Sequence, residues 1–82
     1  MSPDKLFSKR YFQMPRAEIG HLRFILESYD GLAFARTLDN QLALVEIAYP
    51  PSRRHDVEPL LEVLAVEIGL QAVAAPAVVP PH

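Results

Sequence analysis

The stretch YDGLAFARTLDNQLALVEI, residues 29–47, decides the fold because it contains two strand-like segments separated by a short polar break. Residues 32–38 and 42–49 are rich in apolar side chains, and Asp39 and Asn40 lie between them. Asp and Asn both tolerate the positive φ that a tight hairpin turn requires. The sequence therefore predicts two antiparallel strands joined by a two-residue turn.

Amphipathic helices are predicted on both sides of this hairpin. The first begins at Arg16, and Gly31 stands where a C′ glycine would end it. The second has Asp56 as its expected N-cap, Pro59 in its first turn and Gly69 at its end. Their apolar faces are expected to contain Ile19, Leu22, Ile25, Leu26 and Tyr29 in the first helix, and Val57, Leu60, Leu61, Leu64 and Ile68 in the second.

Two further strands complete the predicted order. The alternation in residues 7–14 indicates a first strand, and residues 70–74 indicate a short fourth one. Strand, helix, strand, strand, helix, strand is the order of the ferredoxin-like α+β fold, in which both helices cover one face of an antiparallel sheet. We predict one such domain over residues 7–74, with an N-terminal extension at 1–6 and a proline-rich flexible tail at 75–82.

Composition limits the classes of function. The chain has 82 residues, half of them hydrophobic, and a formal net charge of −2, which argues against binding dominated by nucleic-acid phosphates. It has no cysteine, so thiolate metal sites and thiol nucleophiles are excluded. Its apolar runs are shorter than the roughly 18 residues of a membrane span, and its amino terminus does not resemble a secretion signal. We expect a soluble cytoplasmic protein with no nucleic-acid or membrane partner.

The sheet face left open by the helices is predicted to mediate self-association. Both hairpin strands are largely apolar on either face, which would leave an exposed patch of the size that usually marks an interface. Phe24 adds to this prediction because it points away from the apolar stripe of its helix. We expect a homodimer formed through the open sheet face or a sheet edge, with an interface that contains Phe24, Phe34, Leu42 and Leu44.

A small-molecule site at the start of the first helix is an alternative. The run MPRAEIGHL, residues 14–22, followed by a helix and then Gly31 and Leu32, resembles the start of ACT-type regulatory domains. In that family a glycine lets an amino-acid ligand approach the backbone, although a proline usually precedes it where Ile19 stands here. The resemblance implies a ligand site at Arg16, Glu18, Ile19 and Gly20. A tolerated helix glycine is the other interpretation of Gly20.

A basic segment before the second helix is the other candidate site. Arg53, Arg54 and His55 precede a predicted helix N-terminus, whose free N–H groups and dipole attract anions. The alternative is a loop that is ion-paired with nearby acidic residues. The serines lack the flanking glycines of a nucleophile elbow, and His21 with Glu18 supplies only two potential metal ligands. We therefore predict no catalytic site, no metal and no cofactor.

RNA-recognition domains share the predicted fold but not the residues that bind RNA. Residues 30–37 retain only the glycine, the alanine and one phenylalanine of the RNA-recognition consensus, and Asp30 replaces its basic residue. The sequence favours a self-associating or regulatory protein-interaction module. A sensor domain for an amino acid or another anion is the alternative, and an enzyme is disfavoured.

One further resemblance covers most of the chain. The segment EIGHLRFILESYDGLAFARTLD, residues 18–39, resembles an uncharacterised bacterial family known as domain of unknown function 4911. The resemblance extends over about residues 10–70. Because that family has no assigned activity, it implies domain boundaries and carries no information about mechanism.

Overall fold

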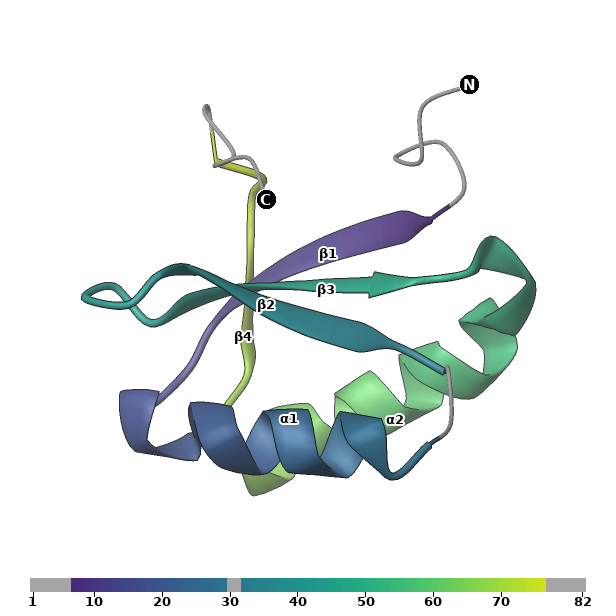
Figure 1. Cartoon of the computed structure of the whole chain (residues 1–82), viewed down its shortest axis with the longest axis horizontal. Helices are drawn as coiled ribbons and strands as arrows, with labels where there is room; N and C mark the ends of the chain where they lie inside the picture. Colours follow the sequence, from purple (N-terminus) through teal and green to yellow (C-terminus); the bar gives the residue numbers. More distant parts are fainter. Residues whose placement is uncertain (1–6, 30–31, 77–82) are drawn as a thin grey trace.

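The computed structural model describes residues 7–29 and 32–76. Within these ranges four strands form one antiparallel sheet in the order β2-β3-β1-β4, and both helices lie on the same face of it (Figure 1). The strands are β1 (Ser8–Gln13), β2 (Phe34–Asp39), β3 (Leu44–Tyr49) and β4 (Gln71–Val73). The helices are α1 (Ile19–Glu27) and α2 (Arg54–Glu67), preceded by the 3₁₀ turns η2 (Arg16–Glu18) and η3 (Pro51–Arg53). The predicted ferredoxin-like α+β fold is confirmed.

The core lies between the helices and the sheet, as the apolar spacing predicts. Its most buried side chains are Leu22, Leu26, Val45, Ile47, Val57 and Leu64. Leu60 and Ile25 pack against this core from partly buried positions. Tyr29 was predicted to belong to it but is exposed, because α1 ends at Glu27 and the helical spacing does not continue to residue 29.

The hairpin turn is longer than predicted. Asp39 still belongs to β2 and pairs with Leu44 across a bulge, so residues 40–43 form the connection. Asp39 Oδ1 accepts hydrogen bonds from the backbone N–H groups of Gln41 at 2.9 Å and Leu42 at 3.0 Å. The positive φ of 52° falls on Ala43. The two-residue turn was therefore a wrong prediction, because an aspartate side chain organises a longer loop.

The helix boundaries also differ from the predicted ones. The first turn after Pro15 is η2, so α1 begins only at Ile19. The second helix begins at Arg54, so Asp56 lies in its first turn instead of capping it, and Pro59 lies inside the helix. Gly69 ends α2 as predicted, with a φ of +76° that favours glycine.

Several predictions fall on residues outside the described ranges. They concern Gly31 as a helix-ending residue, the extension at residues 1–6, and the tail beyond residue 76. Within residues 7–29 and 32–76, no helix is long and apolar enough to cross a membrane.

Candidate functional site

The two edges of the sheet differ in length. β4 pairs with β1 over three residues, whereas five of the six residues of β2 pair with β3. Within the described residues no strand pairs with the other side of β2. The outer side of an edge strand presents N–H and C=O groups that can pair with another strand, and natural edges are often protected by being short or by containing proline. β2 contains no proline. β2 is also the longer edge, and it is regular from Phe34 to Thr37, before the bulge that precedes Asp39. This regular part is therefore the less protected of the two edges.

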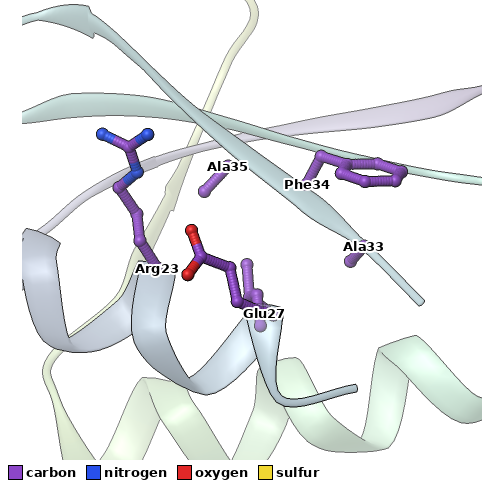
Figure 2. A pocket seen from close by; sticks show the side chains of 6 residues that line it. Arg23, Glu27, Ala33, Phe34 and Ala35 are labelled. Atoms are coloured by element: carbon purple, nitrogen blue, oxygen red, sulfur yellow. The ribbon is translucent and has the colours of Figure 1, made fainter. Parts of the chain in front are cut away.

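A hollow of about 160 Å³ lies beside this edge, between α1 and β2. Figure 2 shows the side chains of Arg23 and Glu27 rising from α1 towards β2. The buried side chains of Leu26 and Ala33 contribute apolar surface to it. The complete lining is Arg23, Leu26, Glu27, Ala33, Phe34 and Ala35. The hollow is thus apolar inside and carries one charge of each sign.

Arg23 and Glu27 are separated by one helical turn and lie on the same side of α1. Among the described residues neither side chain takes part in an ion pair, with each other or with a third group. The arginine precedes the glutamate, which is the less favourable order for pairing within a helix because it opposes the helix dipole. Both charges are therefore available to another molecule.

One aromatic side chain of α1 and one of β2 are exposed. Phe24 of α1 is 72% exposed and Phe34 of β2 is 55% exposed. The Phe34 ring meets the Phe7 ring edge to face, with centroids 6.3 Å apart. Phe24 does not line the hollow beside β2, so its place in an interface stays a prediction. We define the β2 edge surface as Arg23, Glu27, Phe34 and Ala35. Within the described residues it combines an unpaired strand edge, one exposed aromatic ring and two opposite charges without an ion pair.

The other two predicted interface residues lie elsewhere. Leu42 is 58% exposed, but it belongs to the turn between β2 and β3 and not to a strand. Leu44 is half-buried and lies on the open face of the sheet, directly opposite Gln13. Leu42 and Leu44 therefore do not form one continuous strand surface, because the chain changes direction between them.

The open face carries a polar row at its centre. The strand register aligns Arg36, Glu46 and Tyr11 across β2, β3 and β1. Arg36 Nε lies 3.5 Å from Glu46 Oε1, and Glu46 is only 2% exposed. Partial burial raises the pKa of Tyr11, and the charge of the Glu46 carboxylate and a hydrogen bond to it raise that pKa further.

This row corrects the prediction of an apolar open face. β1 adds Lys9, Tyr11 and Gln13 to that face, because they lie opposite Ala48, Glu46 and Leu44. The polar side chains of β1 thus interrupt the apolar patch that was expected from β2 and β3 alone. The strand pairing decides the character of the surface.

The predicted ligand residues fall into two separate groups. The starts of α1 and α2 lie at opposite ends of the helical layer in Figure 1, so Arg16 and Gly20 are not brought together with Arg54 and His55. Each group therefore has to be assessed alone.

In the first group the side chains have local roles. Glu18 Oε2 lies 3.2 Å from His21 Nδ1, and Ile19 is part of the core. Arg16 is exposed in η2. A Cβ on Gly20 would meet no other atom within 4 Å, so nothing packs against this glycine within the described structure.

In the second group Arg53 Nε pairs with Asp56 Oδ2 at 3.1 Å. This contact is the ion-paired loop that the sequence left as an alternative. Arg54 and His55 are exposed in the first turn of α2. No group of three or more potential metal-binding side chains occurs within residues 7–29 and 32–76.

Sequence reasoning did not identify Arg23, Glu27 or the row centred on Glu46. The spacing of four residues between Arg23 and Glu27 was available as a signal, but only the fold shows that both face the β2 edge. For Glu46 the signal was its position among alternate strand residues that are otherwise apolar, namely Leu42, Leu44 and Ala48. The partners of Glu46 depend on the strand register.

Comparison with known proteins gives a family and no activity. Neither the curated proteins nor the solved structures contain a match to this chain. The model of the family described as "Domain of unknown function (DUF4911)" matches residues 12–68, which include α1, β2, β3 and α2. That match covers more than half of the sequence and nearly all of the described core. The chain therefore belongs to the DUF4911 family.

Proposed function

We propose that this protein is a self-associating protein-interaction module that forms a homodimer through the β2 edge surface. The observation that carries the proposal is the outer edge of β2, which is unpaired within the described residues and bears the exposed Phe34. A buried Phe is worth about 1.5–3 kcal/mol relative to an exposed one, so covering the Phe34 ring of each partner favours association before its costs. The lack of cysteine in the sequence supports a reducing cytoplasmic location.

The edge is a better candidate interface than the open face. A partner on the open face would have to cover the row formed by Arg36, Glu46 and Tyr11, which adds a cost of desolvation. A partner at the edge would instead satisfy the outer N–H and C=O groups of β2. It would also cover part of the Phe34 ring, which projects from the open face beside that edge because Phe34 lies opposite Ala48.

Light scattering over a range of protein concentrations tests this proposal. We expect the native chain to be a dimer and Phe34→Lys to be a monomer, because the lysine places a charge in the contact. Val66→Lys is the matched control, since Val66 is 86% exposed on α2, away from β2. Leu44→Lys separates the two surfaces, because it would disrupt an open-face dimer more than an edge dimer. A native chain that is monomeric at high micromolar concentration would contradict the proposal.

A small-molecule sensor is the second candidate function. The hollow between α1 and β2 supports it, since about 160 Å³ lined by Arg23 and Glu27 suits a small molecule with both a carboxylate and an ammonium group. An amino acid has this chemistry. The site differs from the two that the sequence suggested, at Arg16 to Gly20 and at Arg53 to His55.

The thermal midpoint separates the two functions. A sensor should gain about 2.7 kcal/mol of stability at a hundredfold excess of ligand over its dissociation constant. We would measure the midpoint with a panel of amino acids, repeated with Arg23→Gln. A shift that depends only on protein concentration would favour the homodimer and exclude the sensor.

A further inference from the structure

We propose that the two chains of the homodimer pair β2 with β2 in antiparallel orientation, and that Arg23 of each chain forms an ion pair with Glu27 of the other. This inference rests on the proposed function and specifies its geometry. It gives a contact to Arg23 and Glu27, which take part in no ion pair among the described residues.

The orientation follows from the position of α1. This helix lies beside β2 and runs in the opposite direction, and both elements face the same edge of the sheet (Figures 1 and 2). A two-fold axis perpendicular to the sheet makes the two β2 strands antiparallel and keeps both helical layers on the same side. The two α1 helices then lie side by side. An axis along the strands would place the helical layers on opposite sides and leave Arg23 and Glu27 without partners.

The charges are self-complementary about this axis. In an antiparallel pair of identical helices, a residue that lies before the axis faces the residue of the other copy that lies the same distance after it. With the axis midway between Arg23 and Glu27, Arg23 of each copy therefore faces Glu27 of the other. The same contact therefore occurs twice. If both positions carried the same sign of charge, the two copies of the chain would repel each other there.

The strand register follows from the same contact. Arg23 and Glu27 line the hollow together with Ala33, Phe34 and Ala35. We place the axis at Ala35, which lines the hollow and lies on the helix side of the sheet, opposite Ile47. Phe34 of one chain then lies opposite Arg36 of the other. That arrangement covers the Phe34 ring, which is exposed in the single chain. Each hollow is then closed by the partner's copy of α1.

Charge reversal with recombination tests the arrangement. Arg23→Glu gives a chain with two acidic residues at the edge, and Glu27→Arg gives one with two basic residues. Each variant alone should dimerise at least about tenfold more weakly than the native chain, because like charges face each other. An equimolar mixture should form a heterodimer, identified by its mass in native mass spectrometry. The double variant Arg23→Glu with Glu27→Arg should regain the native dissociation constant.

Two controls keep the test decisive. Glu62→Arg makes the same change of charge at an exposed position on α2 and should leave dimerisation unchanged. The thermal midpoint of each variant at low concentration shows that it folds. If the native chain dimerises but the single variants bind as well as it does, or the mixture forms no heterodimer, this arrangement is wrong and the homodimer stands. If the native chain is monomeric, both proposals fail.

Discussion

The two faces of the sheet bury their side chains in different ways. Ile47 and Glu46 are neighbours in β3, and both are almost inaccessible to solvent. Ile47 is covered by the helical layer, whereas Glu46 lies on the face opposite the helices, in the row with Arg36 and Tyr11. One face is therefore buried by packing between layers, and the centre of the other by contacts between neighbouring strands. The two faces should therefore respond differently to substitution.

The largest effect is expected at the polar row. Arg36→Ala removes the cation that pairs with the buried Glu46 carboxylate, and breaking such a pair costs about 3 kcal/mol of unfolding free energy. Replacing both residues by leucine should recover most of this loss, because it removes the charge that needs a partner. Urea unfolding measures both values. Arg54→Ala, at an exposed position, is the control, and an equal effect of the two alanine variants would show that the row is solvated.

An intermediate effect is expected on the helix side, where α2 offers a matched pair of valines. Val57 is buried against the core and Val66 is exposed. Val57→Ala should lower the unfolding free energy by about 2 kcal/mol, and Val66→Ala should change it by less than about 0.5 kcal/mol. The same urea titrations measure the difference. Similar values for the two would mean that α2 does not pack on the sheet as described.

The smallest effect is expected from Tyr11 at alkaline pH. Its raised pKa means that the folded chain binds the phenol proton more tightly than the unfolded chain does. The resulting stabilisation is complete below the usual tyrosine pKa of about 10 and is lost as the pH rises above it. Above that pKa, the unfolding free energy of the Tyr11→Phe variant should therefore fall less steeply with pH than that of the native chain. The difference in phenolate absorbance between native and variant chains reports the titration of Tyr11, and a midpoint at or below the usual value would contradict the prediction.

Local patterns were sufficient for the elements and their order. The apolar spacing of Leu22 and Leu26, and of Val57, Leu61 and Leu64, identified the faces of both helices that form the core. Gly69 marked the end of α2, because a positive φ favours glycine. Turn and cap details were less predictable. An aspartate carboxylate can accept hydrogen bonds from the backbone or pair with an arginine, and its sequence position does not decide which. Asp39 binds the backbone of its turn, whereas Asp56 pairs with Arg53.

Hydrophobic periodicity and turn residues act over a few positions along the chain, so they encode the helices, the strands and the ferredoxin-like order. The tertiary structure alone decided which surfaces of that fold are distinctive. Arg36, Glu46 and Tyr11 become one row only through the strand register, and Arg23 and Glu27 reach the β2 edge only through the packing of α1. The physical reason is that surface chemistry depends on contacts between residues far apart in sequence, and no local pattern encodes the register that aligns them.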